Sequence, residues 1–298
     1  MVRQPSGEQW PIAAAGYVAV IVELGGGLRS CEAGGQPIVD GYAAEEKCAG
    51  GAGQVLAPWP NRVRDGKWDW EGVGHQLALS EPAAHNAIHG LTRWRPWTLV
   101  SRSADSVTVQ CQVDPQPGYP FSVLVSTTWS LSADGLAARH SAVNNGREPA
   151  PFGLGVHPYL MVNGVGADDL VLQVPADTAL RTDDRGLPVE EYAVAGSDVD
   201  YRAGHRIGPA RIDTAFTGGV SGARVSAGGR GVELTLDDSF RWLQVFTGDT
   251  LPADRRRRSV AVEPMTCPPD AFNSRRDVVV LQPDQQWQGA WALRAVTG

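Results

Sequence analysis

In two stretches of the sequence a proline directly follows a residue whose side chain can take up or release a proton. His157 precedes Pro158 in "GVHPYL", and Glu263 precedes Pro264 in "SVAVEPMTCPPDAFN". Proline fixes its own φ and lacks an N–H, so we expect each group to end a short buried strand in a stiff backbone. An imidazole and a carboxylate can act together as acid and base. Read singly, however, Glu263 is more typical of a solvated strand end.

Polar residues in two other rigid segments could bind hydroxyl groups. Asn61 and Arg62 follow a Pro-Trp-Pro segment in "APWPNRVRDGKW", and Asp213 lies in "RIDTAF". A guanidinium offers several donors in a fixed fork, and a carboxylate accepts hydroxyl hydrogen bonds. Each residue also has a purely structural interpretation, as a surface arginine before the Asp65-Gly66 turn and as an Asx-turn residue.

A third segment, "HNAIHGLTRWRPW", places His89 before Gly90, with Trp94 and Trp97 close behind. Flat indole faces suit the C–H faces of sugars, so the segment is compatible with a carbohydrate site. A tryptophan is nevertheless more often part of the core, and a lone histidine is more often structural.

Several classes of chemistry lack their sequence signatures. The chain has no GxSxG, no P-loop and no GxGxxG after a strand, and its histidines lack HxH or HExxH spacing. We therefore expect no metal and no cofactor. The remaining set, one histidine, one glutamate and several hydrogen-bonding groups, suits proton transfer on a neutral, hydroxyl-rich substrate.

Composition narrows the partners and the compartment. A net charge of −7 over 298 residues argues against nucleic acid or an anionic membrane as a partner. The four cysteines lack CxxC spacing, which fits reduced thiols and a cytoplasmic protein, with Cys267 a packed spectator. No charged segment followed by a long apolar stretch opens the sequence, so we expect no signal peptide.

Short runs of period two dominate the chain, and helical periodicity is scarce. Strands are expected on both sides of the Gly25–Gly27 turn, over 106–113, in a hairpin over 121–145 turning at 133–135, and over 230–238, 242–248, 258–264 and 287–296. We therefore predict an all-β fold, a large antiparallel β-sandwich with few short helices, forming one domain over residues 1–298.

Taken together and in order, these segments resemble the aldose 1-epimerase (galactose mutarotase) family. The matching stretches are "LGGGLRS", "NRVRDGKW", "NAIHG", "HPYL", "DTAF" and "VEPMTCPPDAFN", spread over almost the whole chain. The sequence departs from the family pattern at Leu91 after His-Gly and at Leu160 after His-Pro-Tyr.

The resemblance implies a sugar cleft and a role for each residue. Glu263 would be the base that takes the proton of the anomeric hydroxyl, and His157 the acid that protonates the ring oxygen. Arg62, His89 and Asp213, with Asn61 beside them, would hold the sugar. We expect Glu263 to be ionised and His157 protonated, because positive neighbours favour a charged carboxylate.

The leading expectation is thus an aldose 1-epimerase for a free hexose such as glucose or galactose. A hexose-6-phosphate mutarotase stays open, because Arg93 and the run Arg255–Arg258 could bind an anion, although such a run is usually a solvated turn. A non-catalytic carbohydrate-binding module is another alternative. So is a glycoside hydrolase using Asp213 and Glu263. The preferred sugar and the oligomeric state are left open.

Overall fold

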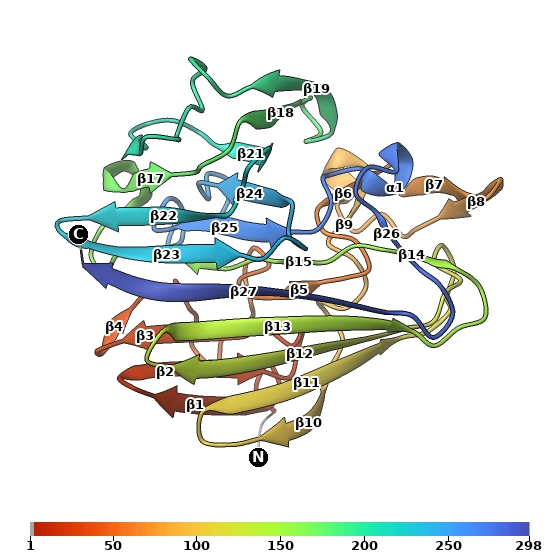
Figure 1. Cartoon of the computed structure of the whole chain (residues 1–298), viewed down its shortest axis with the longest axis horizontal. Coiled ribbons are helices and arrows are strands. Elements are labelled where there is room, and N and C mark those ends of the chain that lie inside the picture. The colour runs from red at the N-terminus through yellow and green to blue at the C-terminus, as the bar shows by residue number, and fades with distance from the viewer. Residues whose placement is uncertain (1–2, 298) are drawn as a thin grey trace.

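The protein is built almost entirely from antiparallel β-strands, as expected from the sequence (Figure 1). A computed structural model describes residues 3–297. Within that range, no helix is long and apolar enough to cross a membrane. The helical elements are single turns: η1 (Pro82–Ala84), η2 (Ala167–Asp169) and α1 (Ala271–Ser274).

The larger sheet has nine strands and carries the long central hairpin. In spatial order its strands are β10 (Thr98–Arg102), β11 (Ser106–Val113), β12 (Val123–Ser132), β13 (Gly135–Asn144), β27 (Gln286–Thr297), β23 (Arg230–Leu236), β22 (Gly222–Ala227), β17 (Val171–Gln173) and β20 (His205–Arg206). The β12–β13 hairpin turns at Ala133-Asp134, in agreement with the expectation.

The second sheet has eight strands and contains the two stretches in which a proline follows His157 and Glu263. Its order is β19 (Pro188–Ala193), β18 (Thr178–Thr182), β21 (Asp213–Thr217), β24 (Trp242–Phe246), β25 (Val260–Met265), β15 (Gly155–Val156) and β5 (Val55–Leu56), with β16 (Tyr159–Leu160) also paired to β25.

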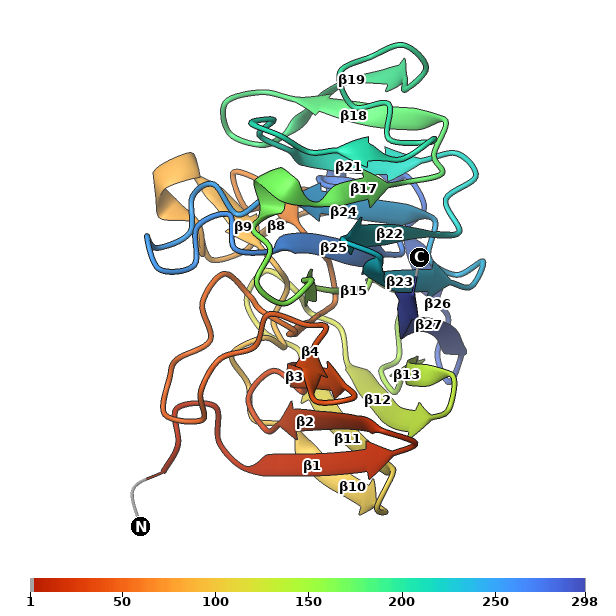
Figure 2. The same cartoon turned by 90° about the vertical axis from the view of Figure 1, so that its left-hand side faces the viewer.

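Smaller sheets complete the molecule. The N-terminal sheet consists of β1 (Gln9–Ala14), β2 (Tyr17–Val22), β3 (Leu28–Ala33) and β4 (Gln36–Pro37), and its strands β1 and β2 pack on β12 (Figure 2). Three two-stranded pairs are β14 (Ala150–Phe152) with β26 (Val279–Leu281), β6 (Arg62–Arg64) with β9 (Asn86–Ile88), and β7 (Lys67–Trp70) with β8 (Val73–Gln76).

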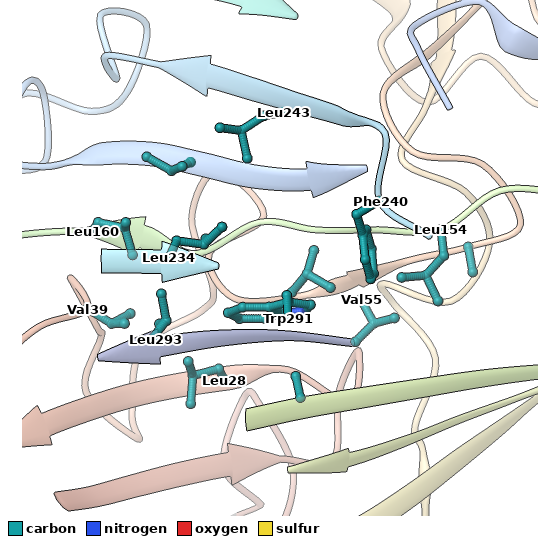
Figure 3. Close-up of a cluster of buried hydrophobic side chains, with 14 of the residues drawn as sticks. Leu28, Val39, Val55, Leu154, Leu160, Leu234, Phe240, Leu243, Trp291 and Leu293 are labelled. Atoms are coloured by element: carbon teal, nitrogen blue, oxygen red, sulfur yellow. The ribbon is translucent and has the colours of Figure 1, made fainter. Parts of the chain in front are cut away.

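One hydrophobic cluster joins the inner faces of the two large sheets. Figure 3 shows Leu234, Trp291 and Leu293 of the nine-stranded sheet gathered with Leu160 and Leu243 of the eight-stranded sheet. The alternation read from the sequence accounts for this packing, because successive side chains of a strand point to opposite faces. In β12 the odd-numbered positions 123 to 131 are all buried, as the period-two pattern predicts.

Two local expectations were wrong. Glu263 does not end its strand, since β25 continues through Pro264 to Met265. Asp213 begins strand β21 and is not a turn residue. Proline is tolerated at position 264 because it lacks only the N–H donor, so the strand can still accept hydrogen bonds there.

The arginine run Arg255–Arg258 does lie in a turn, but its side chains are engaged. Arg255 contacts Glu46, and Arg258 contacts Asp40. Arg257 lies between Asp168 and Asp249, at 2.6 and 2.8 Å. Carboxylates already pair with these three guanidinium groups, so they tie loops together; among residues 3–297, the side chain of the exposed Arg256 contacts only the backbone oxygen of Leu251.

Candidate active site

Strand β25 places Glu263 opposite the gap between two short strands, β15 and β16, that pair with the same edge of β25. On one side of β25 runs β24, with Gln244 directly across from Glu263. On the other side β15 pairs at Met265 and β16 pairs at Ala261. His157 and Pro158 form the break between β15 and β16, so the imidazole faces the strand that carries Glu263.

The two side chains meet at hydrogen-bond distance inside the protein. His157 Nε2 lies 3.2 Å from Glu263 Oε1, and both side chains are at most 5% exposed. Within residues 3–297, His157 Nδ1 and Glu263 Oε2 are buried without a hydrogen-bond partner. A buried polar atom without a partner is costly, so these two atoms are available to a ligand.

Burial sets the protonation preference of this pair. It lowers the pKa of His157 to about 3. It also raises the pKa of Glu263 well above its usual range, with the negative charge of Asp213 acting in the same direction and Arg62 opposing it. The expected ionised pair is therefore not the form that the site favours. The structure favours one proton shared by an uncharged pair, because a low-dielectric site disfavours charge.

Arg62 is locked by two carboxylates beside the pair. Its Nε and Nη2 donate to both oxygens of Glu81 at 2.9 and 3.1 Å. Asp213 lies 3.8 Å away on the cavity side. Burial lowers the pKa of Arg62, but the hydrogen bonds to Glu81 and the charge of Asp213 outweigh it and raise the pKa. The fork expected for hydroxyl binding thus has two of its donors already used by Glu81.

Asp213 is held by Gln244, a residue that the sequence analysis missed. Gln244 Nε2 donates to Asp213 Oδ1 at 2.6 Å. The carboxyl group is 46% exposed toward the cavity. Partial loss of water raises its pKa, while Arg62 and Gln244 act in the lowering direction. The available signal was a single amide within the otherwise apolar strand "WLQVF".

His89 is positioned by a loop that only glycine permits. Its φ is +64°, and its backbone N–H donates to Asn61 O at 2.8 Å. The next residue, Gly90, has a φ of +66°, and a Cβ there would lie 2.2 Å from Ala57 O. The His89 ring packs edge-on to His157 at 5.4 Å between centroids. Burial, and then the positive neighbours, lower the pKa of His89 well below its usual value.

All six residues proposed from the sequence line one cavity of about 480 Å³. This volume falls in the range of roughly 300–1,000 Å³ typical of small-molecule sites. The lining comprises Gly50, Gly51, Asn61, Arg62, Ser80, Glu81, Ile88, His89, Arg93, Trp94, His157, Tyr159, Asp213, Phe246, Thr250, Leu251 and Glu263. The structure brings the six residues together; their roles stay predictions.

Of the two tryptophans considered for a sugar site, one lines the cavity and the other belongs to the core. Trp94 lines the cavity and is 44% exposed, whereas Trp97 is buried in the core. Tyr159 stacks on His157 at 4.9 Å and donates its hydroxyl to Gly50 O at 3.1 Å. Burial raises the pKa of this phenol, so Tyr159 orients the imidazole and stays protonated. Tyr159 and Glu81 also line the cavity, although the sequence analysis gave them no role, and Arg93, considered there only as a possible anion-binding residue, lies in the same wall.

The residues of the wall suit proton chemistry more than metal binding. Within the described part of the chain, no group of three or more His, Cys, Asp or Glu side chains is arranged to hold a metal ion. Cys267 is fully buried, and burial raises the pKa of its thiol to about 12. It faces Gly153, where a Cβ would lie 2.5 Å from the sulfur, which fits the packed spectator expected.

Fold and site together define an antiparallel β-sandwich protein with a polar, sugar-sized cavity and a buried carboxyl–imidazole pair at its wall. The aldose 1-epimerase family model matches residues 9–294, almost the whole chain. The chain belongs to the aldose 1-epimerase family.

Relatives and solved structures agree with this assignment. The uncharacterised protein YihR of Escherichia coli K12 is 34% identical over 280 residues, covering 93% of this chain and 90% of YihR. The structure of the GalM/aldose epimerase homologue from C. elegans superposes with a TM-score of 0.89 at 18% identity, covering 97% and 99% of the two chains. Galactose 1-epimerase from Lactobacillus acidophilus NCFM gives 0.81 at 22% identity, covering 95% and 92%. The structural likenesses show the fold, and the family match supports a mutarotase activity.

Proposed function

We propose that this protein interconverts the α and β anomers of a hexose of the glucose or galactose type. The observation that carries the proposal is the contact between His157 Nε2 and Glu263 Oε1 at 3.2 Å in the cavity wall. Mutarotation must remove a proton from the anomeric hydroxyl and deliver one to the ring oxygen. Both oxygens are bonded to the same carbon, so an acid and a base that touch each other can serve both.

The proton balance of the reaction matches the single proton held by this pair. In ring opening Glu263 takes the hydroxyl proton while His157 gives its proton to the ring oxygen. Rotation about the C1–C2 bond presents the other carbonyl face, and closure reverses the two transfers. Ring opening thus starts from the ionised form of the pair, which burial disfavours, and ends with the uncharged form, which burial favours. Ring closure starts from that uncharged form.

The remaining residues would bind and orient the sugar. Asp213 offers its exposed oxygen to hydroxyl groups, and Arg62, fixed by Glu81, offers the Nη1 face of its guanidinium. His89 is buried and uncharged at neutral pH, and its Nδ1 has no partner in the described range. These groups bind hydroxyls without a metal or a nucleotide.

The test compares anomer exchange in the wild type with that in Glu263→Gln and His157→Gln. Saturation transfer between the α and β signals of glucose and galactose, measured by NMR, reports the rate directly. Removing the base or the acid should each lower kcat/KM about 10²- to 10⁴-fold. Wild-type exchange rates in both variants would overturn the catalytic roles of the pair, whereas exchange no faster than the uncatalysed rate in the wild type would indicate a carbohydrate-binding protein without catalysis.

A further inference from the structure

Arg93 is a cation in the cavity wall that the proposed reaction does not use. Its guanidinium lies 5.0 Å from the centre of the Trp94 ring. Within residues 3–297 it makes no hydrogen bond and no ion pair, although it is only partly exposed. Contact with an aromatic face leaves the in-plane N–H donors free. A planar fork with unused donors is the group that best matches an oxyanion.

The two arginines of the cavity wall, Arg62 and Arg93, differ in their partners. Arg62 is held bidentately by Glu81 and approached by Asp213. In the described part of the chain no carboxylate pairs with Arg93; burial lowers its pKa, and the charge of Glu81 only partly opposes this. A desolvated cation without a counter-ion is unfavourable, and an anion bound beside it would remove that cost.

A second cationic side chain, Lys47, lies against the same Trp94 ring. Lys47 Nζ lies 5.2 Å from the centre of the Trp94 ring; Lys47 itself is exposed, and Trp94 lines the cavity. Lys47 is one of only two lysines in a chain whose net charge is −7. Two like charges beside one ring repel each other, and an anion bound between them would relieve that repulsion.

The backbone holds this arrangement in place. Gln54 Nε2 donates to Arg93 O at 2.5 Å, and Gly25 N donates to Arg95 O at 2.9 Å. The turn itself is closed by Arg95 N donating to Thr92 O at 3.1 Å. The guanidinium therefore projects from a fixed loop, which is what a preformed subsite requires.

The position of Arg93 relative to the catalytic pair indicates which part of a sugar it would meet. Gln54 connects the Arg93 loop to His157: its Nε2 donates to Arg93 O at 2.5 Å, and its backbone O accepts a hydrogen bond from His157 N at 3.2 Å. Gln244, directly across from Glu263, instead holds Asp213. Arg93 is thus on the His157 side of the cavity, where the ring oxygen would lie. The exocyclic C6 of a hexopyranose is attached next to that oxygen.

We propose that Arg93 and Lys47 form an anion subsite, and that the preferred substrates are hexopyranoses with an anionic group on C6. This inference rests on the proposed mutarotase function and deepens it. The sequence motifs favoured a neutral hexose as the substrate, whereas this inference favours the charged alternative, a hexose that carries an anionic group. Phosphate, sulfate and carboxylate share the required chemistry, and the arms of the experiment distinguish them.

The experiment measures kcat/KM for mutarotation of glucose, glucose 6-phosphate, glucose 6-sulfate and glucuronate, after subtraction of the uncatalysed rate, in a buffer free of phosphate and sulfate. The readout is the ratio of kcat/KM for each anionic sugar to that for glucose. In the wild type we expect at least one ratio of about 10 or more, falling as salt is added. The arm with the highest ratio identifies the anion.

Variants then assign the effect to residues. Arg93→Gln should lower that ratio about 10- to 100-fold, the loss of a charge-assisted hydrogen bond, and Arg93→Lys should restore part of it. Lys47→Gln should lower it less, because Lys47 is exposed. Matched controls are Arg95→Gln, in the same loop but bonded to Gln112 O, and Lys67→Gln on β7; both should keep the wild-type ratio.

Three results separate the two proposals. Ratios near or below one for every anionic sugar, or an unchanged ratio in Arg93→Gln, would overturn the anion subsite while the mutarotase function stands. Loss of turnover with all sugars in Glu263→Gln supports the proposed function alone. If the wild type turns over none of the sugars, the proposed function fails. Calorimetric binding of glucose 6-phosphate against glucose, in wild type and Arg93→Gln, would then decide the subsite by itself.

Discussion

Replacing Gln244 by leucine should separate the stability of the protein from its affinity for sugar. Gln244 does not line the cavity, but its Nε2 donates to Asp213 Oδ1 at 2.6 Å. Its other amide atom, Oε1, is buried without a partner within residues 3–297. Leucine has a similar size and removes both polar atoms at once.

The expected change in unfolding free energy is small because two effects oppose each other. A hydrogen bond to a carboxylate contributes about 1.5–3 kcal/mol. Because Asp213 is 46% exposed, solvent screening reduces that contribution to about 1 kcal/mol. Removing the unpaired Oε1 returns about 1–3 kcal/mol. The unfolding free energy in urea should therefore stay within about 1–2 kcal/mol of the wild-type value.

Sugar affinity should respond more strongly. Without its tether the Asp213 carboxylate is free to rotate, so the KM for a sugar bound by Asp213 should rise about 3- to 10-fold, near 1 kcal/mol. Gln9→Leu is the matched control, since Gln9 Oε1 is also buried without a partner in the described range but lies on β1, away from the cavity. A loss of more than about 3 kcal/mol in stability, or an unchanged KM, would refute this reasoning.

Two further predictions concern pH. With ordinary values for a carboxyl and an imidazole, the Glu263–His157 pair would hold its single proton only between about pH 4 and 6.5. Burial widens this window in both directions, so kcat/KM should stay level through neutral pH, falling toward pH 3 and again at alkaline pH; a steep decline between pH 6 and 8 would contradict it. His140, buried between Thr127 and Trp291, has a pKa lowered by burial to about 3, below about 6.5 in the unfolded chain. Its contribution to stability is present above pH 6.5 and is lost as pH falls toward 3, by about 3 kcal/mol at pH 4.5. Between pH 7.5 and 4.5 the loss measured by urea unfolding should be about 3 kcal/mol larger in the wild type than in His140→Gln, in which His89 and His157 still contribute; equal losses in both proteins would rule it out.

The strands were largely predictable because the chain alternates in period two with glycine-rich turns. Strand β11 matches the predicted range 106–113, and the β12–β13 hairpin turns where it was expected to. The strand ends near proline were less predictable. Whether a strand stops at Glu263 depends on its neighbours, and β24 continues pairing as far as Met265.

The candidate site was predictable in its members but not in its interactions. Motif resemblance selected Asn61, Arg62, His89, His157, Asp213 and Glu263, and the structure places all six around one cavity. Gln244 and Glu81 were missed because each acts through another side chain. Such contacts join residues 31 and 19 positions apart, and no local pattern encodes them.

Sequence by itself determined the fold class, the family and the identity of the groups able to move a proton. These depend on local alternation, turn residues and ordered motifs, all of which are written along the chain. Tertiary structure decided which form of the Glu263–His157 pair is favoured, that Arg62 is already paired, and that Arg93 has no carboxylate partner among residues 3–297. The physical reason is that the free energy of a charged side chain depends on its burial and on neighbouring charges, and both come from segments brought together only by folding.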